Sequence, residues 1–207
     1  MQNKNYKNGF TLIELSMALM VTSIVLTAVA TLAFALGRAN DSTDDTSQKQ
    51  AQVRYASLRI SQLIRNSKLI CSTYGDDLAI WRADDNGDGK INPAELVYLE
   101  AGEDRSHLWL LEFTSGSSIV SLSSIKNGSA KSELILSCDE RRVVLVPQCS
   151  NVQFSLDTDA PKSKLVSVSF DMVQKSVTRR YQINAALACW AGHLLDENGD
   201  NIVNDDD

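Results

Sequence analysis

The sequence predicts an α+β fold, in which a long N-terminal α-helix packs on an antiparallel β-sheet domain. Three observations support this prediction: an apolar run over residues 10–37, apolar residues at helical spacing over residues 53–64, and short β-rich segments from residue 77 onward. Apolar residues that recur every three or four positions indicate an amphipathic helix, whereas strict alternation indicates a half-buried strand. We therefore expect the first half of the helix to span a membrane and its second half to cover a sheet.

The apolar run is long enough to cross a bilayer as a helix, which needs about 20 apolar residues. Glu14 is the only charged residue within it. An acidic residue at the centre of a membrane helix costs roughly 2.5–3.5 kcal/mol, so an ionisable residue in this setting is a functional hypothesis by default. The leader, residues 1–9, contains two lysines and no acidic residue. Basic residues before the span favour a cytoplasmic N-terminus, with the rest of the chain outside the cytoplasm.

Residues 9–15 read Gly-Phe-Thr-Leu-Ile-Glu-Leu, and this stretch resembles the processing motif of the type IV pilin superfamily, which includes the type II secretion pseudopilins. The resemblance implies that prepilin peptidase cleaves between Gly9 and Phe10 on the cytoplasmic side, and that the new amine of Phe10 is methylated. It also implies that Glu14 pairs with the terminal amine of a neighbouring subunit. A charge in an apolar environment is tolerable when it is paired in this way.

The resemblance implies a single-pass inner-membrane protein whose globular domain lies in the periplasm or in an extracellular filament. Its expected partners are prepilin peptidase, other pilin or pseudopilin subunits, and the membrane. The alternatives are an ordinary signal anchor and a secretory signal cleaved near residues 33–35, an Ala-Phe-Ala match to a cleavage site. Neither alternative requires Glu14, nor a glycine directly before the first apolar residue.

The expected organisation has five parts. They are the leader 1–9, the transmembrane and polymerisation helix 10–37, an amphipathic half of the helix over 38–72, a β-rich globular domain over 73–195, and an acidic tail over 196–207. The clearest strand is 166–172, whose apolar residues alternate with polar ones, and a turn at 174–176 predicts a hairpin with 177–185. Further strands are expected at 78–81, 96–99, 108–111, 134–136, 143–146 and 152–156. A surface loop with a short strand is expected over 115–132.

Residues 84–95 match the calcium-loop pattern D-x-[DN]-x-[DN]-G-x₅-E at every position. Hard oxygen ligands in this number suit Ca²⁺. The predicted ligands are Asp84, Asn86, Asp88, the backbone carbonyl of Lys90, both oxygens of Glu95, and Asn92 directly or through water. The flanking segments read as strands, so we expect an EF-hand-like loop inserted in a β-hairpin with a structural ion. The alternative is an acidic surface turn, since Asn-Gly and Asp-Gly are turn formers.

The acidic tail offers a second candidate loop with the same ligand spacing. Its predicted ligands are Asp196, Asn198, Asp200 and Asp207. Asn201 stands where the pattern has glycine, and asparagine tolerates left-handed backbone. The alternative is a disordered acidic tail that binds no metal.

All four cysteines follow the apolar span, and an even number of cysteines in an oxidising compartment suggests two disulfides. We expect Cys138 to pair with Cys149 across a short strand, and Cys71 to pair with Cys189, joining the helix end to the C-terminal region. The alternative is that the four residues remain free thiols. A zinc site is not expected, because the sequence has no C-x-x-C pair and its histidines are isolated.

Composition argues against a general nucleic-acid binder. The formal net charge is −6, and removal of the two leader lysines gives −6 − 2 = −8 for the processed chain, whereas nucleic-acid affinity depends on neutralising phosphates. The arginine doublets at 141–142 and 179–180 leave a DNA-binding competence pilin as a weak alternative. No enzyme is expected, because His107 and His193 have no nucleophile nearby and no serine lies in a nucleophile-elbow pattern.

These observations favour a calcium-stabilised structural subunit, a minor pilin or pseudopilin, of a type IV pilus or type II secretion filament. The alternative from a different class is a membrane-anchored, calcium-dependent adhesin or binding module that does not polymerise. The N-terminus of the mature protein distinguishes the two.

Overall fold

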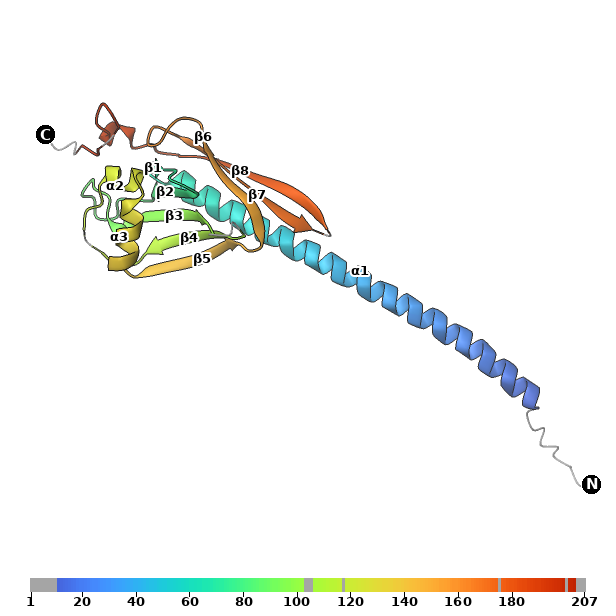
Figure 1. Cartoon of the computed structure of the whole chain (residues 1–207). Helices are drawn as coiled ribbons and strands as arrows, with labels where there is room; N and C mark the ends of the chain where they lie inside the picture. The colour runs from blue at the N-terminus through green and yellow to red at the C-terminus, as the bar shows by residue number, and fades with distance from the viewer. Residues whose placement is uncertain (1–10, 103–105, 117, 175, 200, 204–207) are drawn as a thin grey trace, which may run out of the picture. The chain divides into compact units, whose positions relative to one another are not determined.

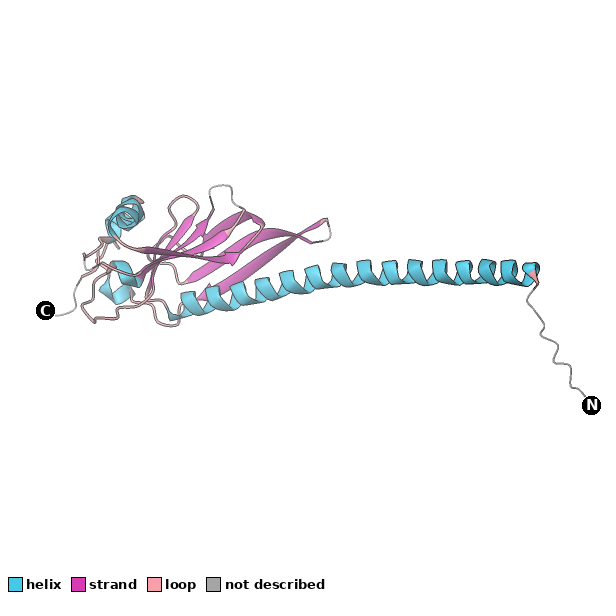
Figure 2. Ribbon diagram, turned by 90° about the horizontal axis from the view of Figure 1, so that it is seen from below, coloured by secondary structure: helices cyan, strands magenta, loops and turns pink. Residues whose placement is uncertain are grey.

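The computed structural model describes residues 11–102, 106–116, 118–174, 176–199 and 201–203. The chain divides into two compact units, residues 1–47 and residues 48–207, which are described separately. Helix α1, Leu12–Asn66, begins in the first unit and ends in the second. One long helix and a β-rich part are plain in both views (Figure 1, Figure 2), so the predicted α+β class is confirmed.

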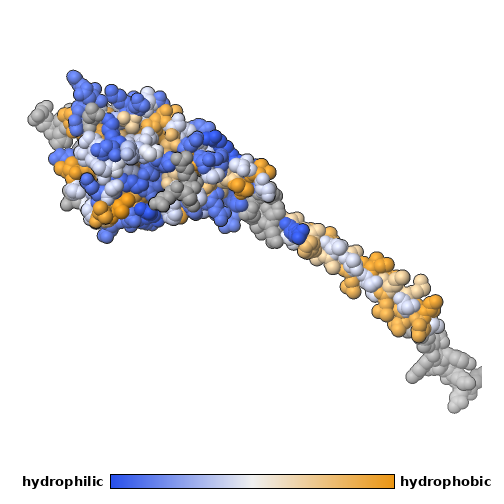
Figure 3. All heavy atoms as spheres, in the orientation of Figure 1, coloured by the Kyte–Doolittle hydropathy of each residue, from blue (hydrophilic) through white to orange (hydrophobic). Residues whose placement is uncertain are grey.

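The first unit contains the apolar half of α1. Within the described residues, Leu12–Ala39 is a 28-residue helical segment that is long and apolar enough to cross a membrane, and its side chains are not buried by the protein. Figure 3 shows apolar residues, in orange, along this part of the helix. Its hydroxyl groups bond to the helix's own backbone: Thr22 Oγ1 donates to the carbonyl of Ala18 at 2.9 Å, and Thr27 Oγ1 to that of Ser23 at 2.8 Å. Such bonds satisfy polar groups where no water is available.

In the second unit, α1 ends at Asn66, six residues before the predicted limit at residue 72. The hydroxyl of Ser67 donates to the carbonyls of Leu63 and Ile64, and its backbone N–H donates to Ile64 at 3.2 Å. The next residue leaves the helix, because the N–H of Lys68 donates to the carbonyl of Trp81 at 3.0 Å. The predicted helical segment therefore included a strand.

Two antiparallel sheets follow the helix. The first has the order β1-β2-β3-β4-β5, with β1 Leu69–Ser72, β2 Asp77–Trp81, β3 Leu96–Ala101, β4 Leu108–Phe113 and β5 Glu140–Val146. The second has the order β6-β7-β8, with β6 Cys149–Leu156, β7 Leu165–Gln174 and β8 Val177–Ala186. The predicted hairpin is confirmed, since β7 pairs with β8 up to Gln174 and Val177.

The first sheet has a hydrophobic cluster on each face. One cluster combines Ile60 and Ile64 of α1 with Ile80 of β2 and residues of the second sheet. The other contains Trp81 and Ala79 of β2. Successive residues of a strand point to opposite faces, so β2 contributes to both clusters. Burial on both faces explains why β2 and β3 read as continuous apolar runs rather than as alternating strands.

Two short helices cover the second cluster, where the sequence predicted a loop and a strand. They are α2, Leu122–Lys126, and α3, Ser129–Ser137. Leu122 and Ile125 of α2, and Ala130 and Leu134 of α3, are buried in the cluster. The side chain of Ser121 caps α2, accepting from the N–H of Ser124 at 3.2 Å. The predicted strand at 134–136 is therefore wrong, because these residues lie in α3, where Leu134 is buried in the cluster and Leu136 is exposed.

Asp157 fixes the connection between β6 and β7. Its Oδ1 accepts from the hydroxyl of Ser163 at 2.6 Å and from the backbone N–H groups of Lys164 and Leu165, each at 3.1 Å. These bonds, with that from Ser163 the largest contributor, lower the pKa of Asp157 from 3.8 to about 2. Because the pKa is lowered in the folded state, the ionised carboxylate stabilises the fold at any pH above the ordinary aspartate pKa. This stabilisation is lost as the pH falls towards the lowered pKa.

We expect the Asp157→Asn variant to be less stable than the wild type at neutral pH, and the difference to shrink as the pH falls from about 4 to about 2. Urea unfolding of both proteins at several pH values measures this difference. Asp159→Asn removes an exposed carboxylate from the same connection and serves as the control. A stability difference that stays constant over this pH range would contradict the assignment.

Candidate functional site

The acidic loop lies between two paired strands, as the sequence predicted. Trp81, the last residue of β2, pairs with Leu96, the first residue of β3. Gly87 and Gly89 have φ values of +72° and +67°, in the left-handed region that favours glycine. The loop ends in a short 3₁₀ helix, Pro93–Glu95, in which Asn92 and Glu95 form a reciprocal capping box.

Asp88 lies within hydrogen-bond distance of two other predicted ligand side chains, Asn86 and Asn92. Its Oδ1 accepts from the backbone N–H of Lys90 at 2.8 Å, and its Oδ2 accepts from the side-chain amides of Asn86 at 2.9 Å and Asn92 at 3.2 Å. Hydrogen bonding to the ionised form, chiefly from the N–H of Lys90, holds the pKa of Asp88 below its ordinary value. The side chains at positions 86, 88 and 92 therefore converge.

Glu95 and Asp84 close the loop from the buried side. Glu95 Oε1 accepts from the N–H of Asp85 at 2.7 Å, and its Oε2 accepts from Trp81 Nε1 at 3.3 Å. Asp84 Oδ2 accepts from Lys68 Nζ at 3.0 Å. Asp84 Oδ1 is buried and has no hydrogen-bond partner among the residues that the structure describes. Lys68 and Trp81 are the contacts that sequence reasoning missed, because the loop pattern contains neither residue.

The loop borders an open hollow of about 450 Å³, whose lining includes Asn86, Asp88, Asn92 and Glu95. Among the described residues, no group of three or more histidine, cysteine, aspartate or glutamate side chains is gathered as a metal site. A cation here would therefore draw on amide and backbone carbonyl oxygens as well as carboxylates, which is usual for Ca²⁺. Calcium binding stays a prediction.

The second acidic segment forms a closed turn next to the first loop. The N–H of Asp196 donates to the carbonyl of Asn201 at 3.0 Å, and Asn201 Nδ2 donates to Asp196 Oδ2 at 3.0 Å. Asn198 is exposed, whereas the predicted ligands Asp200 and Asp207 lie outside the described residues.

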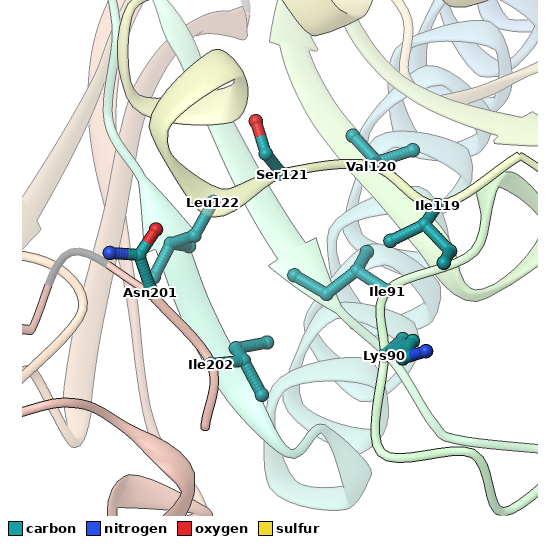
Figure 4. A pocket seen from close by; sticks show the side chains of 8 residues that line it. All are labelled: Lys90, Ile91, Ile119, Val120, Ser121, Leu122, Asn201 and Ile202. Carbon is teal, nitrogen blue, oxygen red and sulfur yellow. The ribbon is translucent and has the colours of Figure 1, made fainter. Parts of the chain in front are cut away.

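A hollow of about 220 Å³ separates the two acidic segments (Figure 4). Lys90 and Ile91 of the first loop and Asn201 and Ile202 of the second segment all line it. The carbonyl of Ile91 also accepts from the N–H of Val120 at 2.8 Å, so the first loop is held from a second direction.

At the other end of the chain, Glu14 lies in the first turn of α1. Its Oε2 accepts from the backbone N–H of Thr11 at 3.0 Å and from the Thr11 hydroxyl at 2.9 Å, and its own N–H donates to that hydroxyl at 3.4 Å. This reciprocal pair is the capping-box arrangement of a helix N-terminus. Gly9 and Phe10 lie outside the described residues.

The family comparison concerns this segment. Residues 4–30 match the prokaryotic N-terminal methylation motif. The chain carries a type IV pilin-like prepilin signal. A signal of this kind implies processing by prepilin peptidase and assembly of subunits into filaments, and with the apolar helix it fits a membrane-anchored, pilin-like protein of structural rather than enzymatic type. No curated protein and no solved structure matched the chain.

Neither predicted disulfide is present, because none of the four cysteines, all of which lie in the described part of the chain, takes part in a disulfide. Cys138 and Cys149 flank β5, whose seven extended residues span about 23 Å at about 3.3 Å each. A disulfide needs Cα atoms within about 7 Å. The pairing fails because the intervening strand is extended and its two ends lie at different hydrophobic clusters. Cys149 belongs to the first cluster, and Cys138 packs against the second.

The Cys71–Cys189 pairing fails for a different reason. Cys71 is fully buried under α2 and α3, and burial raises the pKa of its thiol to about 12. Cys189 is exposed. Its neighbour Ala188 donates its N–H to the carbonyl of Arg65 at 2.9 Å, and its other neighbour, Trp190, packs against the second cluster, whereas the Cys189 side chain itself is exposed.

Proposed function

We propose that this chain is a structural subunit, a minor pilin or pseudopilin, of a type IV pilus or type II secretion filament. In this proposal prepilin peptidase processes it, and calcium stabilises its globular domain. The observation that supports it most directly is the match of residues 4–30 to the methylation motif at the start of an apolar helix. The mechanism is assembly rather than catalysis.

The unburied apolar side chains of Leu12–Ala39 support assembly. Before assembly, lipid covers these side chains, and after assembly the same faces of neighbouring helices cover them. Apolar surface against lipid tails gives little driving force by itself, so packing and polar contacts decide which helices associate. Glu14 supplies such a contact, because its carboxylate can accept a hydrogen bond from the Phe10 amine of an adjacent subunit.

The globular domain favours a minor component over a major one, by analogy with the smaller and more regular domains of major pilins and pseudopilins. Its β-rich part carries an inserted acidic loop between β2 and β3 and two extra helices over the first sheet. A component present in few copies tolerates such additions, because they need not repeat along a filament.

We expect the mature chain to begin at Phe10 with a methylated amine. Intact mass and N-terminal sequencing, performed separately on sheared surface filaments and on membranes, measure this. A Gly9→Val variant, which removes the residue before the cleavage point, serves as the unprocessed control. The processed chain in sheared filaments would indicate a pilus subunit, and the processed chain only in membranes would indicate a pseudopilin or an assembly-priming minor pilin. An intact Met1 would contradict the proposal and favour the adhesin.

A further inference from the structure

One oxygen of Asp84 is buried without a partner in the acidic loop. The side chain of Asp84 is 8% exposed, and its Oδ2 is held by Lys68 Nζ at 3.0 Å. Within the described part of the chain, its Oδ1 has no hydrogen-bond partner. Nearly all buried polar atoms in proteins are paired, and an unpaired one costs free energy. Asp84 occupies the first ligand position of the loop pattern, so this oxygen has the chemistry and the place of a cation ligand.

The other ligand positions supply further oxygen atoms. Glu95 is buried, with its carboxylate fixed by Trp81 Nε1 and by two backbone N–H groups. Oε2 accepts from Trp81 Nε1 and from the N–H of Asn92, whereas Oε1 accepts only from the N–H of Asp85 and keeps a second lone pair for a cation. Asn86 and Asn92 both reach Asp88 Oδ2 with their side-chain amides. Asn86 Oδ1 accepts from the backbone N–H of Asp88 at 3.1 Å and keeps a second lone pair that can face an ion. Turning over the amide of Asn92 exchanges its oxygen and nitrogen, so that its oxygen can also face an ion.

Charge favours a cation at this place. The loop positions contain the carboxylates of Asp84, Asp88 and Glu95, and the cationic group bonded to one of them is Lys68. Hard oxygen ligands from carboxylates, side-chain amides and one backbone carbonyl select Ca²⁺ over softer metals.

The loop is also tied at both ends to the junction between α1 and β1. Lys68 lies two residues after the end of α1, and besides Asp84 it bonds through its N–H to Trp81 and through its carbonyl to the N–H of Ala191 at 3.0 Å. Trp81 in turn donates to Glu95. The first ligand position is therefore bonded to Lys68 and the last to Trp81, and Lys68 and Trp81 are bonded to each other.

We propose that residues 84–95 bind Ca²⁺ through Asp84, Asn86, Asp88, the Lys90 carbonyl, Asn92 and Glu95, and that the bound ion fixes the junction between α1 and β1 through Lys68 and Trp81. This inference deepens the calcium stabilisation named in the proposed function, and only its consequence for a filament, a stiffer link between the helical core and the domain, also rests on processing and assembly. The binding and the local stabilisation are properties of the single chain.

Calcium binding is tested on the full chain in detergent. We expect 10 mM Ca²⁺ to raise Tm by about 5–10 °C over EDTA, as for a ligand at about one hundred times a Kd of about 10⁻⁴ M. We expect Mg²⁺, which demands a smaller octahedral shell, to raise it much less. Terbium bound in place of calcium should show emission sensitised by tryptophan, since the Trp81 indole touches Glu95. No shift and no terbium emission would overturn the proposal.

Variants locate the site. Glu95→Gln and Asp88→Asn should each weaken binding at least tenfold and remove most of the Tm shift. If the buried Glu95→Gln variant does not fold, the less buried Asp88→Asn variant decides. Asp85→Asn is the matched control, because this neighbouring carboxylate is 66% exposed, pairs with Arg82 and occupies no ligand position. Retention of the full shift in Asp88→Asn, or its loss in Asp85→Asn, would overturn the assignment.

The coupling to the junction has its own readout. In the wild type, Ca²⁺ should increase protection of the β1 amides, residues 69–72, from hydrogen exchange. Lys68→Met should still bind terbium with sensitised emission but should lose most of this gain in protection. An undiminished gain would refute the role of Lys68, whereas an unprocessed N-terminus would refute the proposed function and leave the calcium results unaffected.

Discussion

Replacement of Glu14 by alanine is expected to abolish incorporation into filaments while membrane insertion remains intact. Removal of a carboxylate from an apolar span makes insertion easier, by roughly 2.5–3.5 kcal/mol on insertion scales for a central position. The same change removes the partner that we propose for the methylated amine of Phe10 in an adjacent subunit. Co-expression of wild-type and variant chains, followed by separate assays of the membrane and filament fractions, measures both effects.

The capping box gives this experiment a sharp control. Glu14 bonds to the N–H and the hydroxyl of Thr11, so loss of assembly in the alanine variant could also result from a frayed helix end. Glu14→Gln keeps an oxygen that can accept from Thr11 but removes the charge. If the charge pairs with an amine, the glutamine variant fails to assemble as the alanine variant does. Normal assembly of the glutamine variant would assign Glu14 to helix capping.

Replacement of Phe170 by alanine is expected to lower the free energy of unfolding by about 3–5 kcal/mol, as for other buried aromatic residues truncated to alanine. Phe170 is fully buried on β7 and stacks on Tyr181 with ring centroids 5.8 Å apart. It belongs to the cluster that also contains Ile60 and Ile64 of α1, so the cavity would open where the helix and both sheets meet.

Urea unfolding of the full chain in detergent measures this loss. Val173→Ala on the same strand is the matched control, because Val173 is 54% exposed and surface substitutions usually change stability by less than about 0.5 kcal/mol. A loss below about 1 kcal/mol for the Phe170 variant would mean that the second sheet contributes little to the common core.

Sequence periodicity predicted much of the fold because the strands of the second sheet alternate plainly, as in β7. It failed for α3, where Leu134 and Ile135 read equally well as a strand. A short apolar run does not distinguish a strand from a helix, and only the cluster beneath α3 decides. The Cys138–Cys149 prediction failed because proximity in the chain was taken for proximity in space, although an extended strand separates the two residues.

The candidate loop was predictable only in its local features, and not in its contacts with residues distant in the sequence. Its ligand spacing is a local property, and the structure bears out the local features of Gly89 and of the flanking strands. The contacts of Lys68 with Asp84 and of Trp81 with Glu95 depend on the pairing of β1 with β2 and on the path of the loop. The loop pattern cannot supply them, because Lys68 lies outside it and before β1.

The hydroxyl groups of the apolar helix have a consequence for how such helices recognise one another. Ser16, Ser23 and Thr31, like Thr22 and Thr27, donate to carbonyls of their own helix. Their protons are thus already engaged, and over Leu12–Ala39 a neighbouring helix meets a surface nearly free of directional bonds. Two such helices could slide or rotate past one another at little cost in free energy. The axial register of an assembly would therefore depend on Glu14, and the rest of the span would provide apolar contact without fixing the position of the neighbouring helix.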